Sequence, residues 1–239
     1  MTTVRFASPL PVRESLVSNN ANTMSIALFV LFLRCKRMLQ TAVVALVCCS
    51  LVGSISMAQE QGIADQDFQL AAGYYQKSDW AQSAAAFEDF TGRYPGHAKS
   101  PEAKFFLAES KIQLENYADA LVGFQKFVDA NPNHKFAPRA MFRMGEAAYQ
   151  LGKGKIALKS LELFIKKYPR HELVEYAMPY LGELRIDFNE PKLAQRAFTT
   201  ALRLFPESEL ADQNRYGLAQ SYRMLGKANT AARYWQYVV

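Results

Sequence analysis

Hydrophobic and small residues recur every 37 positions in the larger part of the chain, and this spacing predicts a repeated helical unit. Pro95, Pro132, Pro169 and Pro206 lie 37 residues apart. A small residue lies 24 positions before each proline, and an aromatic or leucine side chain lies eight before it. Several columns in one register indicate a repeat architecture. With one further member each, the columns are Ala71, Ala108, Gly145, Gly182 and Ala219, and Phe87, Phe124, Leu161, Phe198 and Trp235.

The apolar positions inside each unit follow helical spacing. In the second unit, Phe105, Ala108 and Ile112 share one helix face, and residues 117–130 carry a second apolar stripe. Ser100 stands where an N-cap is expected. No long run of alternating β-branched residues occurs in the repeats, so strands are not expected. The sequence predicts an all-α protein of about five helix pairs over residues 59–239, with units beginning near residues 64, 101, 138, 175 and 212 and the last unit incomplete.

The first 58 residues differ from the repeats and have the order of an export leader. Residues 1–23 are polar and without period, and we expect them to be disordered or to precede the true start codon. In residues 24–58, a basic patch (Arg34–Arg37) precedes an uncharged apolar segment and two small residues, which is typical of a signal peptide cleaved after Ala58. A membrane anchor over residues 39–57 is the alternative. The protein is therefore expected in the periplasm, or anchored in a membrane and facing it.

Charge and cysteine content exclude several functions for the repeats. The formal net charge is +6, but residues 1–58 carry +4 of it, which argues against a nucleic-acid partner. Cys35, Cys48 and Cys49 all lie in the leader, so the repeats have no disulfide, thiolate nucleophile or zinc–cysteine site. No catalytic or phosphate-binding motif is present. We expect a protein that is not an enzyme and uses no cofactor.

The repeat resembles the tetratricopeptide repeat (TPR). The second unit carries Leu107, Ala108, Phe124 and Pro132 where that family's pattern places a large apolar residue, a small residue, an aromatic residue and the closing proline. The resemblance covers residues 64–239 and implies a right-handed α-solenoid. The period of 37 exceeds the usual 34. The Tyr-Pro loops are similar to those of bacterial envelope proteins, namely the outer-membrane assembly lipoproteins and the Tol–Pal-associated periplasmic protein.

This resemblance implies a non-catalytic scaffold or adaptor for protein–protein interaction in the bacterial envelope. The alternative is the amino-terminal docking region of a longer membrane-associated or secretion-related protein or enzyme. TPR proteins bind partners in a groove lined by the first helix of each unit. The residues carried over by register are Phe68, Tyr75, Phe105, Glu109, Ile112, Phe142, Glu146, Tyr149, Glu183 and Tyr216.

The predicted groove is an aromatic and aliphatic strip with three glutamates. It favours a protein or peptide partner with apolar side chains and some basic character. The competing interpretation is that the phenylalanine column packs against the neighbouring unit and that the glutamates are only solvated.

Three further features complete the sequence predictions. His97, His134 and His171 also recur at 37 residues, and their separate loops keep them too far apart for a shared metal ion, so no metal site is expected. Pro179 falls within the first helix of the fourth unit, where it should delay or kink the helix. The chain stops without a polar capping helix, so we expect either a truncated sequence or an oligomer contact. That contact would use Tyr234, Trp235, Tyr237 and Val238.

Overall fold

The computed structural model describes residues 59–236, and the chain from Gln61 onward forms a compact unit of its own. The predictions for residues 1–23 and 24–58, including the signal peptide and the anchor at 39–57, concern residues outside the described part. The same holds for Tyr237 and Val238. Within residues 59–236 the secondary structure is helical, with turns between the helices and no strand.

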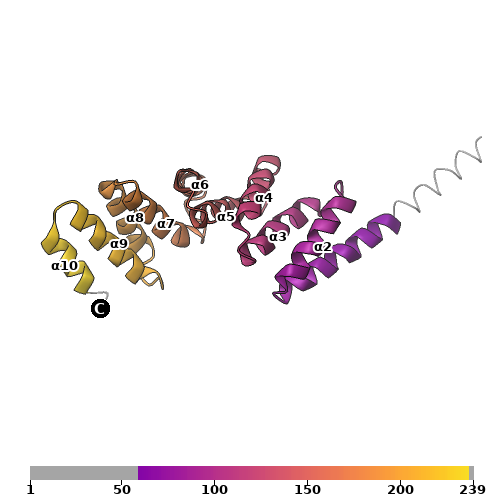
Figure 1. Cartoon of the computed structure of the whole chain (residues 1–239), viewed down its shortest axis with the longest axis horizontal. Coiled ribbons are helices and arrows are strands. Elements are labelled where there is room, and N and C mark those ends of the chain that lie inside the picture. Colours follow the sequence, from indigo (N-terminus) through magenta and orange to yellow (C-terminus); the bar gives the residue numbers. More distant parts are fainter. Residues whose placement is uncertain (1–58, 237–239) are drawn as a thin grey trace, which may run out of the picture. The chain divides into compact units, whose positions relative to one another are not determined.

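The helices follow one another in chain order, and each packs on its neighbours in sequence (Figure 1). The first described helix covers residues 59–76. The others are α2 (Trp80–Arg93), α3 (Ser100–Gln113), α4 (Tyr117–Ala130), α5 (Ala137–Gln150), α6 (Gly154–Lys167), α7 (Val174–Asp187), α8 (Pro191–Leu204), α9 (Ala211–Met224) and α10 (Ala228–Gln236).

These helices pair into five repeats that keep the period of the sequence. The first repeat is the helix 59–76 with α2, and the next four are α3 with α4, α5 with α6, α7 with α8, and α9 with α10. The helices α2 to α9 each have 14 residues. The second helices α4, α6 and α8 each pack on their own first helix and on the first helix of the next repeat. Helix α2 contacts the helix 59–76 through Phe87 and Phe90, which lie against Phe68, and it also packs on α3. The predicted all-α solenoid of TPR-like repeats is therefore confirmed.

The longer loop of each repeat follows the second helix, and a histidine organises three of these loops. The Nδ1 atoms of His97, His134 and His171 accept hydrogen bonds from the backbone N–H two residues further on, at 3.2, 3.2 and 3.1 Å. The three rings lie edge-on to Phe90, Phe127 and Phe164 respectively. The histidines therefore hold the backbone that leads into the next helix.

The N-cap expected at Ser100 and the delay expected for the helix of Pro179 are both wrong. Ser100 is the first residue of α3, the N-cap position is taken by Lys99, and the Oγ atom of Ser100 has no hydrogen-bond partner. Pro179 does not delay its helix, since α7 begins at Val174 in register with the other first helices and continues to Asp187. Proline removes one backbone donor and crowds the carbonyl four residues earlier, and α7 continues through Pro179 despite both.

Small residues let the helices of the core approach closely. Gly182 in α7 and Gly217 in α9 lie on either side of the buried ring of Phe198 in α8. A Cβ atom on either glycine would lie 2.4 or 2.3 Å from that ring. Gly145 leaves the same kind of room for Leu161 in the third repeat. The small column that the sequence shows is therefore a packing requirement at the helix crossings.

Candidate functional site

The phenylalanine column of the predicted groove is buried. Phe68, Phe105 and Phe142 lie in the core, and Ile112 is buried with them. For Phe68 and Phe105, the residue that precedes the next first helix covers the ring. The ammonium group of Lys99 lies 5.0 Å from the centre of the Phe68 ring, and Phe136 stacks on Phe105 with the ring centres 4.5 Å apart.

Because these rings are covered, they fit the competing interpretation, in which the phenylalanine column packs against the neighbouring repeat. The phenylalanines fill the space between a first helix and the loop that enters the following one, so they stabilise the stacking of repeats. Tyr216, the fifth member of the column, is different. Its side chain is 49% exposed, and within residues 59–236 no following repeat covers it.

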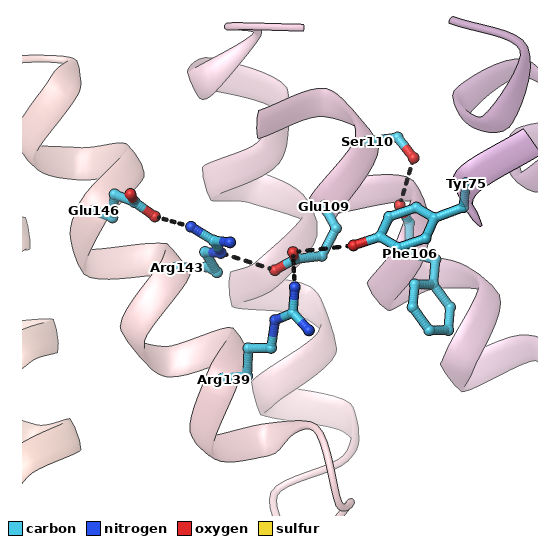
Figure 2. A network of polar contacts seen from close by, with 7 residues as sticks. All are labelled: Tyr75, Phe106, Glu109, Ser110, Arg139, Arg143 and Glu146. Atoms are coloured by element: carbon cyan, nitrogen blue, oxygen red, sulfur yellow. Dashed lines mark hydrogen bonds and ion pairs between the residues drawn. The ribbon is translucent and has the colours of Figure 1, made fainter. Parts of the chain in front are cut away.

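Glu109, the first of the three glutamates, is fully buried in a polar network that joins three repeats (Figure 2). Arg139 and Arg143 reach it from α5 and donate to its two carboxylate oxygens at 2.6 and 3.1 Å. The hydroxyl group of Tyr75 donates to it from the first repeat at 3.5 Å. A buried carboxylate is tolerated only where such partners compensate for the water it has lost. Glu109 is therefore not available to a partner protein.

The other two glutamates are partly buried and also have partners. Glu146 accepts a hydrogen bond from Arg143 at 2.7 Å, and Glu183 accepts one from the hydroxyl group of Tyr149 at 2.7 Å. The side-chain amide of Gln213, in α9, also donates to Glu183 at 2.9 Å. The bonds to Glu183 connect α5, α7 and α9, so the face formed by these first helices is held together by polar contacts.

Burial and these carboxylates alter the acidity of nearby groups. Burial and the charge of Glu109 raise the pKa of Tyr75. Burial and the hydrogen bond to Glu183 raise the pKa of Tyr149. Burial opposes the charge of Arg143, but Glu109 and Glu146 outweigh it, and the pKa of Arg143 is raised. At neutral pH the tyrosines are therefore neutral donors and the arginine is a permanent cation.

A hollow of about 690 Å³ opens on this face between the third and fourth repeats. Its α5 side carries the network residues Arg139, Arg143 and Glu146, with Phe142 beneath them. Helix α7, the loops before α7 and α9, and the first turn of α9 supply the remaining lining: Glu172, Leu173, Glu175, Tyr176, Pro179, Tyr180, Leu210 and Gln213. The volume lies within the range of pockets that accept small ligands or a few side chains of a partner.

A second hollow of about 260 Å³ continues along the same face between the fourth and fifth repeats. Both hollows are bordered by Gln213 and lie on the face of α5, α7 and α9, and we call them together the first-helix groove. Five of the predicted site residues border this groove: Phe142, Glu146, Tyr149, Glu183 and Tyr216. The other residues of the second hollow are Ile186, Asp187, Gly217 and Gln220.

The junction that carries the larger hollow differs from the others. The helices α6 and α7 pack less closely than the matching helices of the neighbouring junctions. The side chain at one repeat position differs here. Leu184 of α7 occupies the position at which α3, α5 and α9 have Ser110, Ala147 and Ser221. In the first junction, that position lies against Ser83 at 2.8 Å. A leucine needs more room than a serine or alanine, so α7 is set further from α6.

Several groove residues were missed by sequence reasoning. Arg139 and Arg143 were missed because their columns hold unrelated residues in the other repeats, such as Glu102 and Phe106. Tyr176 was missed for the same reason, although an aromatic residue in a column of polar ones was a usable signal. The glutamates before and inside α7, Glu172 and Glu175, lie outside the three columns that the TPR register selects.

Residues 59–236 contain neither a membrane-spanning helix nor a metal-binding cluster. Within residues 59–236, no helix combines the length and the apolar character that crossing a bilayer requires. In the same stretch, no group of three or more His, Cys, Asp or Glu side chains is placed to hold a metal ion.

Stacked helix pairs whose first helices line a groove are the architecture of TPR proteins, and the chain has this fold. The family model YfiO, described as an outer membrane lipoprotein, matches residues 60–155. The resemblance to TPR proteins of the bacterial envelope is thus supported over the first repeats. No curated protein sequence matches the chain.

Solved TPR structures superimpose on the repeats. The crystal structure of MamA protein is 16% identical and gives a TM-score of 0.63, with 73% of this chain and 89% of that chain covered. MamA 41-end from Desulfovibrio magneticus RS-1 is 19% identical, with a TM-score of 0.63 and coverage of 73% and 92%. A tetratricopeptide repeat protein from Parabacteroides merdae ATCC 43184 is 15% identical, with a TM-score of 0.63 and coverage of 73% and 65%. These similarities establish the fold of the chain.

Proposed function

We propose that the chain is a non-catalytic scaffold of the bacterial envelope whose first-helix groove binds a segment of a partner protein. The observation that carries the proposal is the hollow of about 690 Å³ and its continuation past Gln213 on the face of α5, α7 and α9. Exposed aromatic side chains border it at Tyr176 and Tyr216, each 49% exposed. Aromatic residues at the rim of a concave surface are typical anchors in protein–protein recognition.

The envelope part of the proposal has two supports. The family model that matches residues 60–155 is described as an outer membrane lipoprotein. The order of basic patch, apolar segment and small residues in positions 24–58 is that of an export signal. The site of action is therefore proposed to be the periplasm, with or without attachment to a membrane.

Photo-crosslinking in living bacteria tests the groove. A benzophenone amino acid is placed at position 176 or 213, and the matched controls carry it at position 122 of α4 or position 163 of α6. Val122 and Leu163 are exposed and lie outside the groove. We expect crosslinks to a distinct protein from positions 176 and 213 and none from the controls. The same adducts from all four positions, or from the controls alone, would contradict the proposal.

A further inference from the structure

The two sides of the larger hollow differ in how their charges are matched. On the α5 side, Arg139 and Arg143 are bound by Glu109 and Glu146 at 2.6 to 3.1 Å. On the α7 side, Glu172 and Glu175 form no ion pair with any Lys, Arg or His of residues 59–236. With Glu109 included, the charged groups at the hollow are two arginines and four glutamates, so an excess of negative charge remains on the α7 side.

An exposed aromatic ring lies beside these unmatched carboxylates. Tyr176 follows Glu175 in α7 and is 49% exposed on the border of the same hollow. The matching positions of the other repeats are polar: Asp65, Glu102, Arg139 and Gln213. An exposed tyrosine at this position is therefore not required by the packing of repeats. The face of a tyrosine ring attracts a cation, and the attraction adds to that of nearby carboxylates.

From these residues we infer that the partner presents a lysine or arginine side chain to Glu172, Glu175 and Tyr176, next to a bulky apolar side chain. The cation lies over the Tyr176 ring between the two carboxylates. The apolar neighbour packs on Pro179, Tyr180 and Leu210, which border the same hollow. This inference rests on the proposed function and gives it a chemical class of partner, a cationic and apolar segment. The carboxylates that bind the partner's cation are then those of Glu172 and Glu175, in α7 and the loop before it. Glu109 and Glu146 are already paired with arginines.

An acidic segment does not fit the same surface. The charges of Arg139 and Arg143 are already compensated by Glu109, which is fully buried and keeps its position, and by Glu146, so an acidic segment would gain little from them. It would also meet the two unmatched glutamates, where like charges repel. The paired arginines therefore stabilise the fold, and the unpaired glutamates favour a partner segment of positive charge.

The test uses a displayed library of random peptides of about 12 residues, selected on the full chain at low salt. Three variants are then compared with the wild type for binding of the enriched peptides: Glu172→Gln with Glu175→Gln, Tyr176→Ala, and the control Glu207→Gln. Glu207 is exposed and lies outside both hollows. Circular dichroism verifies that each variant keeps its helices.

We expect the enriched peptides to carry Lys or Arg beside an apolar residue. Removing both carboxylates should weaken their binding about fivefold or more at low salt and less at high salt, because exposed ion pairs are screened. Removing the Tyr176 ring should weaken it about tenfold. The control should not change it. A peptide in which the cation is replaced by glutamate should regain binding on the double variant Glu172→Lys, Glu175→Lys.

Two results would overturn the inference, and they are distinguishable. Enriched peptides without a cation, whose binding is lost on substitution of Gln213 or Tyr216 but not of Glu172 and Glu175, would refute the cationic partner and leave groove binding intact. Peptides that bind every groove variant as well as the wild type, or the absence of any enrichment, would refute the proposed function together with the inference.

Discussion

At the scale of single residues, Glu109 is the most deeply buried charged side chain of residues 59–236. It lies in the core with no exposed surface and is bound by side chains of the first and third repeats. The pairs bridge 34, 30 and 34 positions of sequence, so each joins neighbouring repeats rather than neighbours on one helix. A charge buried in this way stabilises one arrangement of three repeats and penalises every arrangement that leaves it unpaired.

Replacing this carboxylate should be costly. We expect Glu109→Ala to lower the free energy of unfolding by about 3 to 5 kcal/mol, because Arg139 and Arg143 would lose their main acceptor. Urea unfolding followed by circular dichroism measures the difference. Glu207→Ala is the matched control, since that side chain is exposed and forms no ion pair within residues 59–236, and it should change stability by no more than about 0.5 kcal/mol. Equal effects of the two variants would refute the role given to the network.

The tyrosines of the same face should make the fold sensitive to alkali. Burial and neighbouring carboxylates raise the pKa values of Tyr75, Tyr149 and Tyr180 in the folded protein. A raised pKa means that the folded state holds its proton more tightly, so this stability is complete below the unfolded pKa of about 10 and declines as pH rises above it.

Absorbance of tyrosinate should therefore rise in two phases in the folded chain, with a late phase that becomes smaller in Tyr149→Phe. In urea, all the tyrosines should titrate together near pH 10. A single phase near pH 10 for the folded wild type would contradict the burial and hydrogen bonding described for these hydroxyl groups.

Residues of this kind mark the limit of sequence reasoning. The buried positions Ala108 and Phe124 could be predicted because a repeat shows its packing positions several times over. The partners of Glu109 could not, because each network residue occurs once and its partners lie in other repeats. The sequence also could not show that the phenylalanine column is buried, because its burial depends on the residues that cover it, such as Lys99 and Phe136.

At the scale of the helix, the repeats depend on close crossings. Gly182 of α7 and Gly217 of α9 leave room for Phe198 of α8, and the distances from a built Cβ atom to the ring are far below van der Waals contact. The column of Gly182 holds Ala108 in the second repeat. A packed core accommodates an added methyl group only by moving a ring or a helix.

We therefore expect Gly182→Ala to destabilise the chain by about 1 to 3 kcal/mol through overpacking. Gly92→Ala is the matched change in α2, where nothing lies within 4 Å of the added atom. It should stabilise the chain by about 0.5 to 1 kcal/mol, because alanine favours the helix over glycine. Thermal unfolding of both variants measures the two effects. Stabilisation by both variants would show that the Phe198 ring moves to accommodate the added methyl group, and it would contradict overpacking at this crossing.

The helix scale is also where the sequence predicted most. The helix pairs and their period follow from the spacing of prolines, small residues and aromatic residues, and the structure has helices in that register. The N-cap expected at Ser100 is not formed. Lys99 occupies the N-cap position, its own N–H donates to the ring of His97, and no side chain caps the first turn of α3.

At the scale of the whole molecule, the five repeats share one fold, but their surfaces differ. The first three repeats are joined by the Glu109 network, while the groove lies over the third, fourth and fifth. The wider junction at Leu184 and the unmatched glutamates of α7 are departures from the repeat, and they coincide at one hollow. Departures that packing does not require are where recognition is expected in a solenoid.

The most direct test of the account is hydrogen exchange of the full chain, alone and in complex with the partner captured from position 176. The account predicts slower exchange in α5, α7, α9 and the loop 168–173, with α4 and α6 unchanged. Protection confined to α4 and α6, with the groove helices unchanged, would contradict the claim that this face binds the partner.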